Sequence, residues 1–460
     1  MPTTSASMRM PGRLSILCWA SRTNGSWRQK RDHILVRSSD QRRRLMPSLL
    51  DRLHTLGLKK AAEVSSPRPK ANKISMVDAI GSGAKILENQ LGNVVIAEKS
   101  YPYGYLHGNI EFKDMVKVES IHKAGRLNSG GENLKKMIFL DTETTGLSGG
   151  TGTLAFLVGI ARFDDEGLKL TQFLVEDPSE EAAMLLEFAN QTSDIEAVIT
   201  FNGKSFDMPL LKSRYVINRL PIPFSEWGHL DLLHLSRRIW RQRLASRSLK
   251  DLEIEILNIP RSDDEVPGWM IPEIYFNYLR TGDASQIANV VYHNAMDIVS
   301  LAALYMAITK MLDVDLFNQK FHSWDVFAIG QLYEAIGEVY KSISIYEHCL
   351  SLMDIDLSKK MEINTRLAKL YKKASNWDKA RYLWETNGNN GDIDACIELA
   401  KYYEHEQRDV PNAFVWTHLA EANLEKSDIV RYKKKVIKNE LRVRKERLEK
   451  RMINVSEKNS

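Results

Sequence analysis

The feature that most constrains this chain is a short apolar run that ends directly at two carboxylates. Met137–Leu140 is followed by Asp141, Thr142 and Glu143, and such an apolar run predicts a buried β-strand. Because residues i and i+2 of a strand point to the same face, Asp141 and Glu143 are expected to converge, as a hard divalent cation requires. An acidic turn after an edge strand would give the same letters, so this motif alone is weak support for a metal site.

A third carboxylate follows another apolar run, AVIT at 197–200, in the stretch FNGKSFD. We expect its last residue, Asp207, to open the next helix near that helix's positive N-terminal end. The letters GKS also occur in phosphate-binding loops. That pattern requires a glycine five positions before Gly203, where Val198 stands, so we reject a loop of this kind.

A fourth carboxylate, Asp297, lies four residues after His293 in an apolar, helix-like run. Residues at i and i+4 share one helix face, so one of the pair can bind a metal while the other handles a proton. For this pair alone, a surface His–Asp contact is the more common explanation. Taken together, the three motifs are much more specific than any one of them.

The segments around these motifs follow strand and helix patterns. Further strands are predicted at 154–163 and 168–176, with the turn signal DDEG between them. A helix with an acidic first turn is predicted at 179–192, and another begins at Asp207. Three strands, a helix, a strand and a helix-rich remainder are typical of the ribonuclease-H-like α/β fold.

The order of the motifs, DxE, then Nx₃FD, then a late His/Asp helix, resembles the three exonuclease motifs of the DEDD superfamily. TFNGKSFDMPLL is similar to the second exonuclease motif of family-B DNA polymerase editing domains. DTETTGL is similar to the first motif of bacterial proofreading subunits. Over 136–310, the strings LDTETTGLSGGTGTLAFLVG, TFNGKSFDMPLL, HLDLLHLSRRIW and YHNAMDIVSL resemble YprB-type ribonuclease-H-like proteins, some of which carry tetratricopeptide-like repeats after this domain.

This resemblance implies a 3′→5′ exonuclease that acts on single-stranded DNA or RNA with two Mg²⁺ or Mn²⁺ ions, about 3.5–4 Å apart. By position, Asp141 would bridge both ions. Glu143 and Asp297 would complete one site, and Asp207 would support the other ion directly or through water. The candidate substrate-binding residues are Thr144, Leu147, Asn202, Phe206 and Arg241.

The third motif departs from both common patterns of the superfamily. One subclass has His five residues before the last Asp, where this chain has Tyr292, and the other has Tyr four residues before it, where this chain has His293. We expect His293 to take or orient the proton of the attacking water, because a neutral imidazole titrates near the working pH. Tyr292 is the alternative.

Other polar clusters compete for a role. His229, Asp231 and His234 lack the HExxH spacing of a zinc site, so zinc is disfavoured and Asp231 is expected to line the nuclease cleft. The loop SGGTGT at 148–153 is expected to be a tight strand connection, with a phosphate cradle as the alternative. A basic stretch suits phosphate contacts and base stacking, or equally a solvated helix face; it contains Arg237, Arg238, Trp240, Arg241, Arg243 and Arg247.

The C-terminal part contains three similar segments. Tyr333, Tyr371 and Tyr403 lie 38 and 32 residues apart, which brackets the tetratricopeptide-like period of about 34. We therefore predict all-α helical repeats at 326–425, with their tyrosines and tryptophans in the core and a protein partner on their surface. A Lys/Arg-rich tail follows at 426–460.

Charge separates the first part of the chain from the rest. Residues 1–45 carry ten Lys/Arg and two acids, a balance of +8, so the others sum to −3 of the net +5. A disordered basic arm, a targeting leader and an extended translation start are the three interpretations, and we favour the last because a helix-like segment begins at Met46. Residues 46–135 are a mixed region without an assigned role, before the ribonuclease-H-like domain at 136–315.

Composition narrows the function classes. No run of about 18 uninterrupted apolar residues occurs, so no membrane partner is expected. Cys18, Cys349 and Cys396 are scattered without CxxC spacing, which indicates a reducing compartment, the cytoplasm. Two rivals to an exonuclease stay open: a non-catalytic nucleic-acid or protein scaffold on the same fold, which does not need four carboxylates, and a structure-selective endonuclease.

Overall fold

The computed structural model describes residues 74–459, apart from 115–117, 128–130, 132, 147–151, 260–265, 314–320 and 353–354. The described residues all belong to one compact unit, Lys70–Ser460. The predicted basic segment 1–45 and the helix-like segment that begins at Met46 lie outside the described residues. So do Leu147 and most of the SGGTGT loop.

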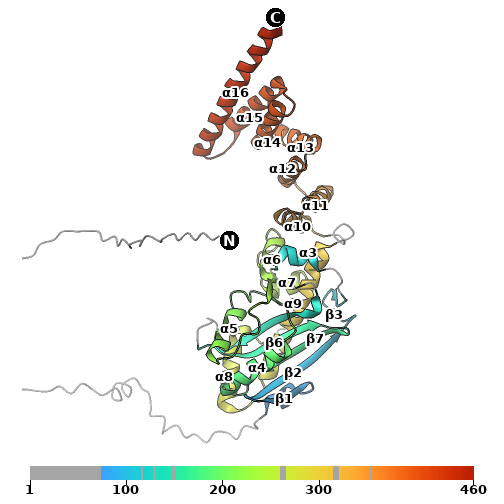
Figure 1. The fold of residues 1–460 in the computed structure, drawn as a ribbon, viewed down its shortest axis with the longest axis vertical. Helices are drawn as coiled ribbons and strands as arrows, with labels where there is room; N and C mark the ends of the chain where they lie inside the picture. The colour runs from blue at the N-terminus through green and yellow to red at the C-terminus, as the bar shows by residue number, and fades with distance from the viewer. Residues whose placement is uncertain are drawn as a thin grey trace, which may run out of the picture. The chain divides into compact units, whose positions relative to one another are not determined.

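A seven-stranded mixed sheet forms the first part of the described chain (Figure 1). Its strands are β1 (Ala84–Asn89), β2 (Gly92–Pro102), β5 (Met137–Thr144), β6 (Ala155–Phe163), β7 (Gly167–Leu174), β8 (Ala197–Thr200) and β9 (Gly228–Asp231). The order is β1-β2-β7-β6-β5-β8-β9, antiparallel from β1 to β5 and parallel from β5 to β9. A separate ribbon pairs β3 (Leu106–His107) with β4 (Ile110–Glu111).

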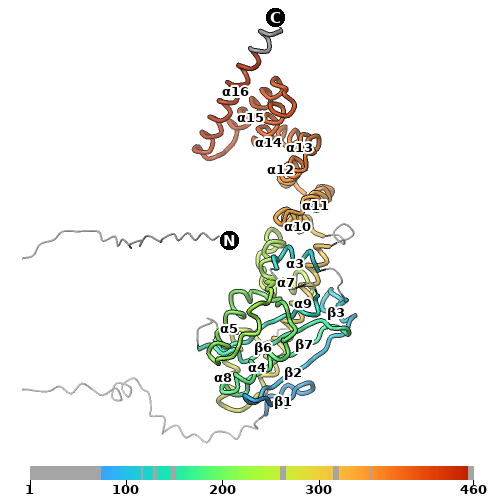
Figure 2. Tube along the Cα trace, in the orientation of Figure 1, coloured from blue at the N-terminus to red at the C-terminus, as the bar shows by residue number. Residues whose placement is uncertain are grey.

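Three of these strands were not expected from the sequence. β1 and β2 come from the mixed region 46–135 and extend the sheet beyond β7; Figure 2 shows them at this edge of the sheet. β9 lies within HLDLLH, where polar letters suggested a binding cluster, and it pairs with β8 through Ile199 and Leu230. The sequence of β9, GHLD, contains no continuous apolar run, whereas the equally short β8, AVIT, does and was recognised by it.

Helices cover both faces of the sheet. They are α2 (Met76–Ile80), α3 (Glu119–Gly125), α4 (Glu181–Gln191), α5 (Asp207–Ile217), α6 (Leu232–Ile239), α7 (Leu249–Glu255), α8 (Ile271–Thr281) and α9 (Ile287–Leu312), with 3₁₀ turns at Leu134–Lys136, Pro178–Glu180 and Gly268–Met270. Phe139 of β5 is buried with α9, whereas Ile138 and Leu140 are buried with α4 and α5. Because side chains alternate along a strand, Asp141 and Glu143 lie on the α9 side.

The helix α9 combines a length of 26 residues with an apolar composition. Among the described helices, it is the one long and apolar enough to span a bilayer. However, 83% of its most apolar 18-residue window is buried inside the protein. Burial on nearly all sides is typical of the core helix of a large domain, which is how α9 packs on β5 and β6.

Six helices then follow in successive pairs. They are α10 (Ser323–Ala335), α11 (Val339–Ser351), α12 (Leu357–Lys373), α13 (Trp377–Asn389), α14 (Ile393–His405) and α15 (Val410–Lys426). Contacts join α10 with α11, α12 with α13, and α14 with α15, so each of the three similar segments forms one helix pair. Tyr333 and Tyr371 are buried, as expected for core residues, and Tyr403 is half-buried. Tyr340 and Tyr382 are 80% and 67% exposed, so the expectation that the tyrosines lie in the core is wrong for these two. The expected fold class, an α/β region followed by an all-α region, is therefore confirmed.

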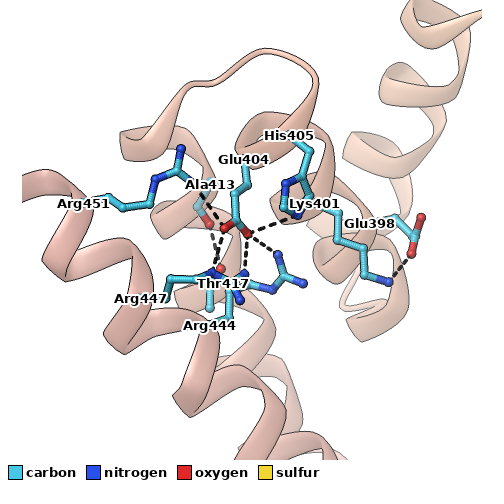
Figure 3. A network of polar contacts seen from close by, with 9 residues as sticks. All are labelled: Glu398, Lys401, Glu404, His405, Ala413, Thr417, Arg444, Arg447 and Arg451. Carbon is cyan, nitrogen blue, oxygen red and sulfur yellow. Dashed lines mark hydrogen bonds and ion pairs between the residues drawn. The ribbon is translucent and has the colours of Figure 1, made fainter.

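The Lys/Arg-rich tail forms a further helix, α16 (Arg431–Asn459). Leu441 and Leu448 bury it against α14 and α15. Three of its arginines surround the buried carboxylate of Glu404 on α14 (Figure 3), and the tail is thus part of the packed helical region. The N–O distances to Glu404 are 2.5 Å from Arg444, 2.8 Å from Arg447 and 3.3 Å from Arg451.

Candidate active site

Asp141 lies on β5, an interior strand of the sheet between β6 and β8, and is half-buried on the side of α9. Asn294 of α9 donates a hydrogen bond from Nδ2 to Asp141 Oδ2 at 2.9 Å. Asn294 is fully buried, and its Oδ1 accepts a bond from Gln172 Nε2 at 2.9 Å. The same Gln172 nitrogen donates to the Val291 carbonyl at 2.8 Å. This chain of hydrogen bonds orients the Asp141 carboxylate from the helix side.

Gly159 allows α9 to come this close to the sheet. It lies opposite Asp141 in the ladder between β5 and β6. A Cβ at this position would lie 2.1 Å from Asn294 Oδ1 and 2.3 Å from Ile298 Cδ1, so any larger residue would displace the helix. A glycine inside an apolar strand is a signal of close approach, and this signal could have identified Gly159 from the sequence.

Asp207 is the first residue of α5, as the sequence predicted. Thr142, which stands between the two carboxylates of β5, donates from Oγ1 to Asp207 Oδ1 at 2.6 Å. Since Thr142 alternates with Asp141 and Glu143 along the strand, it approaches Asp207 from the other face of β5. Asp207 is thereby held at the end of the strand that carries the first motif.

The buried side chain of Asp231 shapes the loop that leads to Asp207. Its two oxygens accept from the backbone N–H groups of Asn202 at 2.8 Å and of Lys204 and Leu233 at 3.1 Å each. Asn202 has φ +69°, a left-handed conformation in which Asn is enriched. Asp231 was expected to line the cleft. It is 2% exposed and bonded to backbone amides, so its role is to position the loop.

The neighbouring histidine, His229, is also occupied within the protein. Its Nε2 lies 2.8 Å from Thr200 Oγ1. Burial, followed by the charge of Lys204, lowers the pKa of His229 to about 4. The pairing of His229 with Thr200 and of Asp231 with backbone amides accounts for these residues without zinc.

Like charges of neighbouring carboxylates act on Asp141 and Glu143. We call the carboxylates of the three motifs, Asp141, Glu143, Asp207 and Asp297, the acidic centre. Burial, then the charges of Asp207 and Glu143, raise the pKa of Asp141 well above its usual value. Burial, then the charges of Asp297 and Asp207, do the same for Glu143. Burial also raises the pKa of Asp207, against the hydrogen bond from Thr142. Within the described chain, no Lys or Arg forms an ion pair with Asp141, Glu143 or Asp207.

The donor set of the acidic centre fits hard divalent cations. Carboxylate oxygens are the ligands that Mg²⁺ and Mn²⁺ prefer, and a cation would relieve the mutual repulsion that raises these pKa values. Across the residues that the structure describes, no three His, Cys, Asp or Glu side chains already form a closed metal-binding group.

His293 and Tyr292 face different surroundings, although they are adjacent on α9. His293 is 12% exposed, and its Nε2 lies 3.6 Å from Asp297 Oδ2. The Nδ1 atom of His293 is buried and has no hydrogen-bond partner. Tyr292 is 52% exposed and lines a separate cavity of about 480 Å³ that includes Lys99 of β2. His293 thus accompanies a carboxylate of the acidic centre, whereas Tyr292 does not.

The expected substrate-binding residues fall in two places. Phe206 is 55% exposed and immediately precedes Asp207, and Asn202 lies on the same loop. Thr144 is the last residue of β5 and donates from Oγ1 to the Gly146 carbonyl at 2.9 Å. Arg241 lies elsewhere, exposed at a cavity formed with α10.

The basic stretch differs in two respects from the expectation. It is not one helix, because α6 ends at Ile239 and the remaining arginines follow in a turn. Trp240 is fully buried in the core, so it cannot stack on a base as we expected. The apolar indole packs inward here while its charged neighbours stay outside, which the letters alone do not distinguish.

The sequence did not identify Asn294, Thr142 or Gln172 as residues of the site. Asn294 and Thr142 stand inside the motifs, between the residues that we singled out. Gln172 is a polar residue inside the apolar run LKLTQFL and is buried in β7. A buried amide must have hydrogen-bond partners, and this requirement is the signal that could have identified Gln172.

Comparison with known proteins adds two findings. A family model of the RNase_H superfamily matches residues 138–309, a range that contains the whole acidic centre. The uncharacterized protein YprB of Bacillus subtilis (strain 168) is 32% identical over 345 residues, which cover 73% of this chain and 82% of that relative. The similarity therefore extends beyond the sheet region.

Proposed function

Because this chain belongs to the YprB family of ribonuclease-H-like proteins, we propose that it is a metal-dependent 3′→5′ exonuclease of single-stranded nucleic acid. The superfamily domain indicates a hydrolase that acts on nucleic acid. One observation carries the finer proposal. The carboxylates of β5, α5 and α9 raise the pKa of Asp141 and Glu143 through their like charges, and no Lys or Arg pairs with Asp141, Glu143 or Asp207 in the described chain.

The acidic centre would hold two Mg²⁺ or Mn²⁺ ions, with Asp141 as the shared ligand. Bound divalent ions would supply charge stabilisation at the phosphodiester and a lowered pKa for a bound water. Asn294 keeps the Asp141 carboxylate in one orientation through its 2.9 Å hydrogen bond. Thr142 does the same for Asp207. These uncharged donors orient the ligands without neutralising them.

We assign to His293 the role of taking or orienting the proton of the attacking water. It lies on the face of α9 that carries Asp297, 3.6 Å from that carboxylate, and a neutral imidazole accepts a proton near neutral pH. Its position on the helix makes it a better candidate than Tyr292, which is mostly solvent-exposed on the side of β2.

We assign to Phe206 and Asn202 the binding of the 3′ end of the nucleic-acid strand. An exposed aromatic ring next to Asp207 offers a base a stacking surface, and such stacking tolerates any sequence. Asn202 and Thr144 add polar groups at the same strand end. A terminal nucleotide held in this way would place its phosphodiester at the acidic centre.

The test is a degradation assay on full-length protein with Mn²⁺ or Mg²⁺ and end-labelled single strands of DNA and RNA. Linear strands with a free 3′ end should lose nucleotides stepwise from that end, and a 3′-blocked strand should be resistant. EDTA should abolish the reaction. The variant Asp207→Asn is the matched control for a contaminating nuclease.

Two outcomes would overturn the proposal. Cleavage of a circular single strand at a rate similar to that of the linear strand would identify an endonuclease on the same fold. Binding of nucleic acid without cleavage of any of these substrates, under both metals, would identify a non-catalytic scaffold.

A further inference from the structure

A cavity of about 430 Å³ lies where the α/β region meets the first helix of the all-α region. One wall comes from the end of α6 and the turn after it, with Arg237, Arg238, Arg241 and Arg247. The other wall comes from α10, with Ala328, Gln331 and Leu332. We call this cavity the arginine pocket. Four of its seven lining residues are cationic and none is acidic.

Some N–H groups of the pocket arginines have no hydrogen-bond partner within the described structure. Neither Arg237 nor Arg241 makes a hydrogen bond or ion pair in the described structure. Arg247 donates from Nη1 to the Leu244 and Ala245 carbonyls, but its Nε is buried without a partner. A buried N–H without an acceptor costs free energy, which applies to the Arg247 Nε. The guanidinium groups of Arg237 and Arg241 are exposed and free to bind a ligand.

The contacts of Arg243 and of the lining residue Arg238 show how the pocket is built. Arg243, in the same turn, pairs with the buried Asp325 of α10 at 2.9 Å and so joins the two walls. Arg238 donates to the Ala124 carbonyl at 3.1 Å, and burial together with the nearby charge of Arg126 lowers its pKa. Thus α10 supplies a carboxylate that fixes the turn through Arg243, while no carboxylate pairs with Arg237 or Arg241 in the described structure.

The chemistry of the lining selects the ligand. Guanidinium groups bind phosphate oxygens in a bidentate manner, and four of them match a ligand with more than one phosphate. None of the lining residues is aromatic, so the pocket offers no surface on which a base can stack. A sugar-phosphate backbone fits such a site better than a free nucleotide, because recognition would not involve the base.

The position of the pocket relates it to the acidic centre. Asp231, which holds the loop of Asn202 and Lys204, caps the N-terminus of α6, and this helix ends at the arginine pocket. Its eight residues span about 12 Å. A strand whose 3′ end lies at the acidic centre could therefore reach this pocket with nucleotides a few positions upstream.

We propose that the arginine pocket is a second nucleic-acid site, which binds the phosphate backbone of a single strand upstream of its 3′ end and to which the all-α region contributes through α10. The proposal deepens the proposed exonuclease function and rests on it for the identity of the strand. It also gives the first helix pair a direct role in substrate binding.

The test measures binding separately from cleavage. Full-length protein in EDTA is titrated into fluorescein-labelled single strands of about 6 and about 30 nucleotides, and anisotropy is recorded from low to high salt. The double variant Arg237→Gln with Arg241→Gln should weaken binding of the long strand at least tenfold. It should also lower the salt slope by about 1.4, since each lost phosphate contact contributes about 0.7 for single strands.

Two controls separate charge from fold. Arg442→Gln removes one positive charge from an exposed part of α16 and should leave the affinity and slope unchanged. The double variant Arg237→Lys with Arg241→Lys keeps both charges but loses the bidentate geometry, so it should retain the slope and lose part of the affinity. Thermal midpoints of all variants show whether the fold is intact.

The inference and the proposed function can fail separately. Unchanged binding of the long strand by the glutamine variant would overturn the pocket assignment, whether or not the protein cleaves nucleic acid. Equal loss of affinity for a polyglutamate chain would also overturn it, because the site would then be a general acidic-peptide site. Loss of strand binding in a protein that never cleaves would keep the pocket and reject the exonuclease.

Discussion

Glu404 in the all-α region and Asp141 in the α/β region are both carboxylates held inside the protein, but their neighbours are opposite in charge. Glu404 is surrounded by Arg444, Arg447 and Arg451, as Figure 3 shows. Asp141 has other carboxylates as its charged neighbours and only a neutral amide, Asn294, as its hydrogen-bond donor. The charge of Glu404 is neutralised within the chain, whereas the charge of Asp141 is not.

The pKa values follow this difference. Burial alone would raise the pKa of Glu404, but the hydrogen bonds and charges of Arg447, then the charge of Arg444, outweigh burial and lower it. For Asp141 and Glu143, burial and like charges act in the same direction and raise the pKa. A group that stabilises a fold is matched by its neighbours, whereas unmatched charge of one sign is typical of a site that binds something.

The largest effect should come from removing the shared carboxylate. Asp141→Asn should lower the cleavage rate at least 10³-fold, or about 4 kcal/mol of barrier, because the proposed common ligand of both ions is lost. Its thermal midpoint should be unchanged or higher, since one repelling charge is gone. Degradation assays and thermal melting measure the two quantities. Near-normal cleavage, or a large fall in the midpoint, would make Asp141 a structural residue like Glu404.

The next effect concerns proton transfer beside the acidic centre. His293→Ala should lower turnover about 10²-fold with little change in ion affinity, and Tyr292→Phe should have little effect because that ring is mostly exposed. Rates would be recorded from pH 6 to 9 at saturating Mg²⁺. If Tyr292→Phe were inactive and His293→Ala active, the roles of the two residues would have to be exchanged.

A smaller effect is expected at the neutralised carboxylate. Glu404→Gln should lower stability by about 1–3 kcal/mol, less than for a fully buried pair because Arg447 and Arg451 are nearly half exposed. Since its pKa is lowered, the contribution of Glu404 is present above its unfolded value of about 4.3 and is lost as pH falls. Hydrogen exchange of α16 at pH 7 reports this change, and unaltered protection would show that the arginine cluster contributes nothing. The cleavage rate should stay at the wild-type value.

The smallest effect is the response of the intact protein to ions. At ten times the dissociation constant, Mg²⁺ or Mn²⁺ should stabilise the wild type by about 1.4 kcal/mol, a shift of about 2 °C in the thermal midpoint for a unit as large as Lys70–Ser460. Glu404→Gln should show the same shift, and Asp141→Asn should show little of it. An equal shift in all three proteins would mean that the ions bind outside the acidic centre.

Several parts of the fold and site were predictable because their signals are local. The strand that ends at Asp141, the helix that opens at Asp207 and the shared helix face of His293 and Asp297 follow from spacings of two to four residues. The helix pairs of the all-α region follow from the same kind of periodicity. The strands β1, β2 and β9 were not predicted, because the strands with which they pair define them rather than a pattern in their own sequence.

The sequence by itself determined which residues carry charge and on which element each one lies. Tertiary structure decided what those residues face. The hydrogen bond from Asn294 to Asp141 joins residues 153 positions apart, and it exists because Gly159 leaves room for α9. Trp240 and Arg241 are neighbours in sequence, yet packing of α10 buries the first and leaves the second exposed. Local periodicity depends on a few adjacent residues, whereas burial and charge pairing depend on which distant surfaces meet.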